Sequence, residues 1–198
     1  TQLEELGAIS FKARVLINRI FNQADIKMIV GKVNFHSYAG FSGGSYTILH
    51  ACGIRTIQNN YKFSINSRSR TGILSGNPVQ ENTNDIIKRC EVTLALNLVV
   101  GHDDTPSKAY WGNFEDSFKE SIQFFEQTYG VYIQDKADIV IASPGGSEYD
   151  CSLYASQESL EIAARTVKDG GVIILVAECA QGHGNPEYLR WFIEIKDF

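Results

Sequence analysis

Apolar residues along the first half of the chain predict strands and helices in alternation. Residues 24–33 are apolar and rich in β-branched side chains, and they predict a strand. Residues 92–101, VTLALNLVVG, predict a fully buried strand because their apolar run barely alternates. Between these strands, residues 77–90 predict a helix that carries its proline in the first turn. Residues 47–61 predict helix in short pieces, since Gly53 weakens any single long helix.

The second half shows strand, helix and strand in succession. A helix over 115–129 carries apolar residues at helical spacing, and another around 160–167 ends at the Asp-Gly-Gly of 169–171. Predicted strands precede and follow that last helix, at 137–143 and 172–178. Glycine at the carboxyl end of each strand is typical of a parallel α/β sheet, so the expected fold class is α/β.

The amino-acid composition and the net charge exclude some classes of function. Hydrophobic residues make up 43% of the chain and charged residues 21%, as in ordinary globular proteins. The net charge of -5 argues against a nucleic-acid partner. The chain has no apolar run long enough to cross a bilayer, and its first segment is too polar for a signal peptide. We therefore expect a cytoplasmic protein with no membrane partner.

The four cysteines, Cys52, Cys90, Cys151 and Cys179, lie far apart in the sequence. A disulfide framework or a zinc site needs tighter spacing. Each cysteine lies in or beside an apolar segment, so we expect buried free thiols.

The chemistry concentrates in residues 34–61, directly after the first predicted strand. Residues 40–45, GFSGGS, place consecutive glycines ahead of a possible helix. The backbone N–H groups of such glycines approach an anion closely, and a helix N-terminus adds partial positive charge. The loop therefore predicts a site for the phosphate or carboxylate of a ligand. A tight turn without a ligand is the alternative.

His36 and Ser42 are the candidate reactive residues of this stretch. An imidazole at a strand's carboxyl end takes a proton from a substrate hydroxyl near neutral pH, and a structural histidine bonded to backbone is the alternative. Ser42 satisfies the G-x-S-x-G pattern, and Asp150 and His183 follow in the order of a hydrolase triad. Six residues separate the apolar run from this motif, whereas a nucleophilic serine lies on a sharp strand-to-helix turn. A Ser42 acyl hydrolase is therefore a minor alternative.

Several segments together resemble the nickel-dependent lactate racemase family, a set of 2-hydroxy acid racemases and epimerases. The similarity runs through nearly the whole chain in family order, which makes it more specific than any single motif. The matching segments are HSYAGFSGGS (36–45), RTIQNN (55–60), GNPV (76–79), LNLVV (96–100), ADIVIASPGG (137–146), Asp150, Leu153-Tyr154 and VKDGGVIILVAECAQGHG (167–184).

That resemblance implies two α/β lobes, with mainly parallel sheets, that face each other across a cleft. Residues 102–113 predict a connector. Residues 1–103 then correspond to the second half of the family's N-terminal domain and residues 104–198 to its C-terminal domain. The family's first half and a piece of its end would be missing here.

The resemblance also implies a reaction. In such enzymes a nickel pincer nucleotide accepts a hydride from C2 of the substrate and returns it to either face, while histidines deprotonate and reprotonate the hydroxyl. His36 matches one of these histidines. The implied partners are a small 2-hydroxy acid and the proteins that make the cofactor. The implied cofactor-binding residues are Gly40, Ser42, Gly43, Gly44, Ser45 and Tyr46.

Some positions differ from the family pattern. Tyr46 stands where the family has a lysine that tethers the cofactor, and Tyr61 where a histidine binds nickel. Ala155 and Glu158 stand where a glutamine and a lysine are usual. A neutral phenol is a poor nickel ligand, so no metal ligand is assigned. Two interpretations stay open: a nickel-dependent racemase or epimerase, and a catalytically silent module that binds a small molecule or a nucleotide phosphate.

Overall fold

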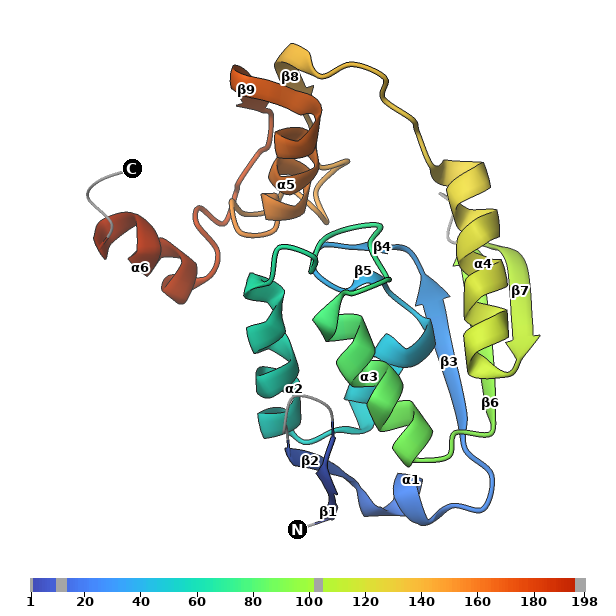
Figure 1. The fold of residues 1–198 in the computed structure, drawn as a ribbon. Coiled ribbons are helices and arrows are strands. Elements are labelled where there is room, and N and C mark those ends of the chain that lie inside the picture. Colours follow the sequence, from blue (N-terminus) through green and yellow to red (C-terminus); the bar gives the residue numbers. More distant parts are fainter. Residues whose placement is uncertain (1, 10–13, 102–104, 195–198) are drawn as a thin grey trace. The chain divides into compact units, whose positions relative to one another are not determined.

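The chain folds into two compact units, Thr1–Val131 and Tyr132–Phe198 (Figure 1). The computed structural model describes residues 2–9, 14–101 and 105–194. Each unit carries helices packed on strands, which confirms the predicted α/β class.

Unit 1 is organised around a three-stranded sheet with the order β3-β6-β7. Strands β3 and β6 are parallel, paired from Met28–Leu94 to Val33–Val99, and β7 is antiparallel to β6. The elements of this unit are β1 (Leu3–Ala8), β2 (Arg14–Asn18), α1 (Arg19–Gln23), β3 (Met28–Val33), β4 (Phe35–His36), β5 (Gly40–Phe41), η2 (Gly44–Ala51, a 3-10 helix), α2 (Ile54–Tyr61), η3 (Lys62–Ile65, 3-10), α3 (Pro78–Arg89), β6 (Leu94–Val100), β7 (Pro106–Gly112) and α4 (Phe114–Tyr129).

Strand β7 corrects the prediction of a plain connector over residues 102–113. Most of its residues are exposed, so its sequence carries no apolar run to reveal it. Helix α4 packs on both β6 and β7 (Figure 1). Because β7 and α4 belong to this packed layer, the first unit extends to Val131. The predicted boundary between residues 103 and 104 lies outside the described residues.

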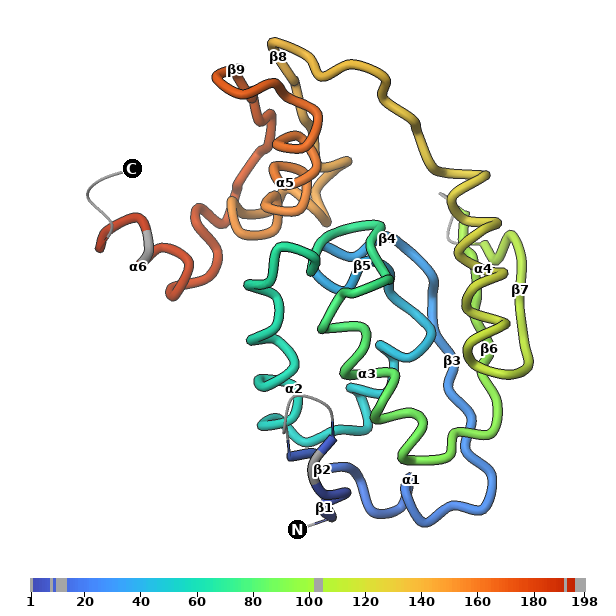
Figure 2. Tube along the Cα trace, in the orientation of Figure 1, coloured from blue at the N-terminus to red at the C-terminus, as the bar shows by residue number. Residues whose placement is uncertain are grey.

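The helices of unit 1 begin and end close to the predicted positions. Helix α3 starts after Asn77, whose side chain accepts a hydrogen bond from the Val79 N–H at 3.0 Å. The predicted helix in pieces over residues 47–61 is confirmed, because Cys52 and Gly53 separate η2 from α2. Figure 2 shows the chain running from β3 through the β4–β5 hairpin into η2.

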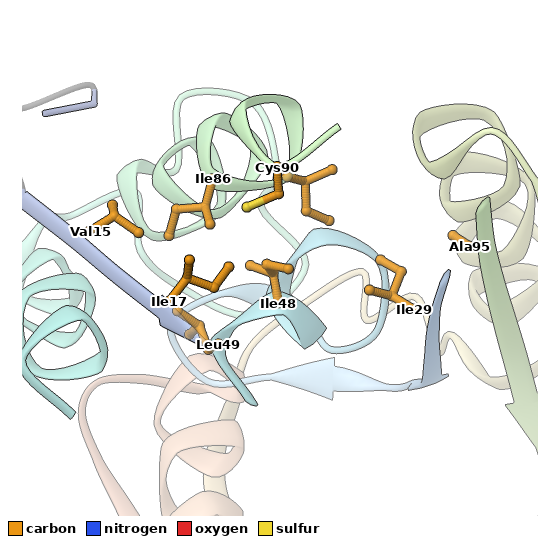
Figure 3. Packing of buried hydrophobic residues seen from close by; sticks show 9 residues of the cluster. Val15, Ile17, Ile29, Ile48, Leu49, Ile86, Cys90 and Ala95 are labelled. Carbon is orange, nitrogen blue, oxygen red and sulfur yellow. The ribbon is translucent and has the colours of Figure 1, made fainter. Parts of the chain in front are cut away.

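Two apolar clusters form the core of unit 1. The first joins β2, η2, α3 and the sheet (Figure 3). The second lies between the sheet, β5 and α4. Strand β6 was predicted to be fully buried, but its burial alternates: Ala95, Asn97 and Val99 are buried and their neighbours are half-buried. The members of the first cluster are Val15, Ile17, Ile29, Ile48, Leu49, Ile86, Ile87, Cys90 and Ala95.

Unit 2 contains a parallel pair of strands with a helix packed on both of them. Its elements are β8 (Ala137–Ala142), α5 (Gln157–Thr166), β9 (Val167–Leu175) and α6 (Pro186–Glu194). Helix α5 ends before the predicted stop at 169–171, because Val167 already pairs with Ala137 as a strand residue. No helix in the described parts of the chain is long and apolar enough to span a membrane.

Candidate functional site

A tight hairpin after β3 positions His36. Strands β4 and β5 are antiparallel, with His36 opposite Gly40. Gly40 has a φ of 85°, and a Cβ there would lie 2.3 Å from the Ile73 carbonyl oxygen. Only glycine fits here, so this hairpin packs closely against the Ile73 backbone, with His36 in the strand opposite Gly40.

The rings of Tyr38 and Tyr46 enclose the imidazole of His36. Their centroids lie 4.4 and 4.6 Å from its centroid, and the Tyr38 ring meets it edge-on. The Nδ1 atom of His36 accepts long hydrogen bonds from the backbone N–H of Ala39 at 3.3 Å and of Tyr38 at 3.5 Å. A nitrogen that accepts carries no proton in the neutral ring, so neutral His36 holds its proton on Nε2.

Three tyrosines continue this cluster. The Tyr46 hydroxyl donates to the Tyr38 hydroxyl at 3.1 Å, and the Tyr61 ring packs edge-on against Tyr38 with centroids 5.2 Å apart. Burial, together with the hydrogen bond to Tyr38, raises the pKa of Tyr46 far above its ordinary value. Tyr46 is therefore a neutral phenol at physiological pH, while the Tyr61 side chain is largely exposed.

The glycine loop packs closely against the sheet and α4. The Gly44 N–H donates to the Asn97 side-chain oxygen at 2.8 Å, in a buried position. Gly44 has a φ of 47°, and a Cβ there would lie 2.4 Å from the ring of Phe118. A Cβ on Gly31 would lie 2.8 Å from the Cα of Gly43. These contacts support the tight-turn interpretation of the glycines, and their cofactor-binding role stays a prediction.

The two serines of the loop bond within the protein. The Ser42 hydroxyl donates to the Lys32 carbonyl at 2.9 Å, and Asp150 and His183 belong to the other unit. The structure of unit 1 therefore supplies Ser42 with neither of its proposed triad partners. Ser45 is fully buried, 3.0 Å from the Thr83 hydroxyl, and its hydroxyl accepts from the Gln80 side chain at 2.8 Å.

Two polar residues that support the site were not singled out from the sequence. Asn97 holds Gly44 and itself donates to the Ser117 hydroxyl at 3.1 Å. Asn77 donates to the Tyr38 carbonyl at 2.9 Å, which connects the start of α3 to the aromatic cluster. A lone asparagine inside the apolar LNLVV segment was the available signal for Asn97, because a buried amide needs partners.

An open groove of about 560 Å³ lies elsewhere on unit 1. It runs between the end of β2, α1, β3 and η2, and His50 lines it. His36, Tyr38 and Tyr46 do not line this groove. Its lining residues are Asn18, Ile20, Phe21, Met28, Ile29, Val30, Thr47, Ile48, His50 and Ala51.

At Tyr46 and Tyr61, unit 1 lacks the amine tether and the histidine ligand that the family resemblance implies for a nickel pincer nucleotide. Tyr46 offers a neutral phenol, tied to Tyr38, in place of an amine tether. The Gly44 N–H is already bonded to Asn97, so it does not point at a phosphate. Within the described ranges, no three His, Cys, Asp or Glu side chains gather closely enough to hold a metal ion.

Comparison with known proteins reveals relatives along the chain. Residues 1–72 match the family model of the lactate racemase N-terminal domain, and residues 133–198 match that of the lactate racemase C-terminal domain. The chain is 33% identical over 198 residues to a lactate racemase of Thermoanaerobacterium thermosaccharolyticum, covering 98% of this chain and 46% of the relative. It is 26% identical over 200 residues to the lactate racemase of Lactiplantibacillus plantarum, covering 100% of this chain and 47% of that relative.

Solved structures give the same result. The lactate racemase apoprotein from T. thermosaccharolyticum superposes with a TM-score of 0.92 at 32% identity, covering 99% of this chain and 48% of that one. A Thermotoga maritima protein shares the fold, with a TM-score of 0.65 at 18% identity, over 98% of this chain and 53% of its own. The chain spans about half the length of the curated relatives it matches. The chain belongs to the lactate racemase family.

Proposed function

We propose that the chain acts on a small 2-hydroxy acid as a racemase or epimerase of the lactate racemase type, with the ligand beside His36. The match of nearly the whole chain to the lactate racemase apoprotein carries this proposal. The chain spans about half of its relatives, so the substrate and the activity of a whole protein are both part of the proposal.

His36 supplies proton exchange with the hydroxyl group of the ligand. Neutral His36 holds its proton on Nε2, because Nδ1 accepts the backbone N–H groups of Tyr38 and Ala39. In this form Nε2 donates to a ligand oxygen, and it accepts a proton from a hydroxyl only after the ring changes tautomer. The rings of Tyr38 and Tyr46 restrict the orientation of the imidazole while this happens.

A second candidate function is a catalytically silent module that binds a small molecule or a nucleotide phosphate. The hydrogen bond between Tyr46 and Tyr38 favours it, because a neutral phenol neither tethers a cofactor as an amine does nor binds nickel well. In this function the fold and His36 are retained for binding, and no bond of the ligand is broken.

Racemisation assays with nickel analysis test the first proposal. The protein, produced together with proteins that make the nickel cofactor, is assayed with a panel of 2-hydroxy acids, and its nickel content is measured by mass spectrometry. We expect His36→Ala to lower turnover by about 10²–10⁴-fold, the usual contribution of a general acid or base. Tyr132→Phe, at an exposed position of unit 2 outside this cluster, is the control and should retain turnover.

Calorimetry separates the two candidates. If the wild-type protein contains no nickel and racemises none of the 2-hydroxy acids, the racemase proposal is rejected. Wild-type binding of a 2-hydroxy acid or of a nucleoside monophosphate, weakened in His36→Ala, would then support the silent module. Absence of binding to either ligand would reject that module too.

A further inference from the structure

Two loops of unit 2 are joined by backbone hydrogen bonds at the carboxyl ends of β8 and β9. The Cys179 N–H donates to the Asp150 carbonyl at 2.8 Å, and the Gln181 N–H to the Cys151 carbonyl at 2.7 Å. The Leu153 N–H donates to the Gly182 carbonyl at 2.9 Å. These bonds run in both directions between the loops, so each loop holds the other in place.

The bond from Cys179 to Asp150 brings two cysteines together. The carbonyl oxygen of a residue lies about 2.8 Å from the Cα of the next residue, and the Cα of a donor lies about 3.7 Å from its acceptor. The Cα atoms of Cys151 and Cys179 therefore lie within roughly 6.5 Å of each other. Disulfides join Cα atoms about 4.4–6.8 Å apart, so this upper limit meets the Cα distance that a disulfide requires.

Both thiols are free in this structure and half-buried, and neither belongs to an apolar core cluster. The Cys151 thiol lies 3.9 Å from the Glu148 carbonyl, a weak contact that a side-chain rotation breaks. Cys179 has a φ of 51°, in a turn closed by the bond from the Gly182 N–H to the Cys179 carbonyl.

The cysteines of unit 1 have different surroundings. Cys90 belongs to the first core cluster and Cys52 packs against it. Burial raises the pKa of Cys52 to about 12 and of Cys90 to about 11. A thiol that stays protonated reacts slowly with oxidants, so these two cysteines do not compete with the pair in unit 2.

We propose that Cys151 and Cys179 form a disulfide when the protein meets a peroxide, which makes the contact between these loops a covalent modification site. One thiolate attacks hydrogen peroxide to give a sulfenic acid and hydroxide. The other thiolate attacks that sulfur, the S–O bond breaks, and a second hydroxide leaves. Two thiols and one peroxide thus become one disulfide and two waters.

The disulfide would fix the loops at the carboxyl ends of β8 and β9, where ligands bind in open α/β sheets. These loops carry Gly145, Gly146 and Gly182, and a Cβ at each would meet open space. The modification would therefore restrain the two loops that carry these glycines. This inference does not depend on the reaction proposed for unit 1.

Peptide mapping of the full chain tests the proposal. The folded protein is treated with hydrogen peroxide, its remaining thiols are alkylated, and the digest is searched for a peptide pair that joins Cys151 to Cys179. We expect this pair to be the main product and to disappear on reduction. Cys151→Ser and Cys179→Ser should each abolish it, while Cys52→Ser should leave it unchanged. Protein oxidised in denaturant, where the loops are not held together, should give mixed pairs.

Thermal unfolding gives a second readout, because the cross-link closes a loop of roughly 30 residues and constrains the unfolded chain. We expect peroxide to raise the unfolding temperature of the wild-type protein by a few degrees. It should leave the unfolding temperature of both serine variants unchanged. The proposal is overturned if both thiols of the folded protein remain alkylatable after peroxide. It is equally overturned if they stop at sulfinic acid, or if the cross-links join different molecules.

Discussion

At the scale of single residues, the loop of residues 40–45 depends on glycine for packing. Gly44 combines a positive φ with contact to the Phe118 ring, and its N–H bonds to buried Asn97. The sequence predicted that these glycines matter, and an anion cradle and a tight turn were both open. The structure shows that Gly44 contacts Asn97 of β6 and Phe118 of α4, which are distant in the sequence.

Gly44→Ala should lower the free energy of unfolding by about 2–4 kcal/mol, because the new Cβ overlaps a core ring and the backbone is left-handed. Gly53→Ala is the matched control: its φ is -71°, and its nearest neighbour is the flexible end of Leu3. Urea unfolding of both variants measures the difference. Equal losses would show that Gly44 tolerates a side chain.

At the scale of elements, caps decide where the helices of unit 1 begin. Asn77 caps α3 and donates to the Tyr38 carbonyl, so one side chain connects the helix to the aromatic cluster. Asn113 caps α4 by accepting from the Glu115 N–H at 2.9 Å, in an exposed position. The sequence predicted α3 from the proline in its first turn and α4 from apolar residues at helical spacing. It did not show that Asn77 also bonds to the aromatic cluster whereas Asn113 only caps its helix.

Asn77→Ala should cost about 2–3 kcal/mol, since it removes the cap and leaves buried partners without a hydrogen bond. Asn113→Ala removes only an exposed cap and should cost about 1 kcal/mol. Chemical denaturation compares the two variants. The NMR signals of the His36 ring protons should shift in the Asn77→Ala variant and not in the Asn113→Ala variant. Unchanged signals in both variants would argue against a connection through Tyr38.

At the scale of the whole molecule, the buried thiol of Cys90 and the half-buried Cys52 and Tyr46 make the stability of unit 1 depend on alkaline pH. Burial raises the pKa values of Cys52, Cys90 and Tyr46 above their ordinary values. A group whose pKa is higher in the folded state binds its proton more tightly there, so its stabilisation is complete below the unfolded pKa and is lost as the pH rises toward the folded value.

Stability should therefore fall as the pH rises from about 9, the range in which an unfolded thiol ionises, toward about 11–12. Urea titrations at about pH 7.5 and about pH 10.5 measure the loss. Cys52→Ala should reduce the loss, because it removes one of the groups that must stay protonated. Constant stability across this range would contradict the burial of these groups.

The sequence by itself determined the family, the α/β class and most elements, because apolar periodicity and ordered motifs are local signals. It did not reveal β7, whose exposed residues form no apolar run, and it set the boundary before 104 although packing extends the first unit to Val131. Only the tertiary structure decided that Tyr46 bonds Tyr38, that Gly44 packs under Phe118, and that Cys151 approaches Cys179. Each of these contacts joins residues from different elements or loops, and their distance depends on how the packed chain folds back on itself.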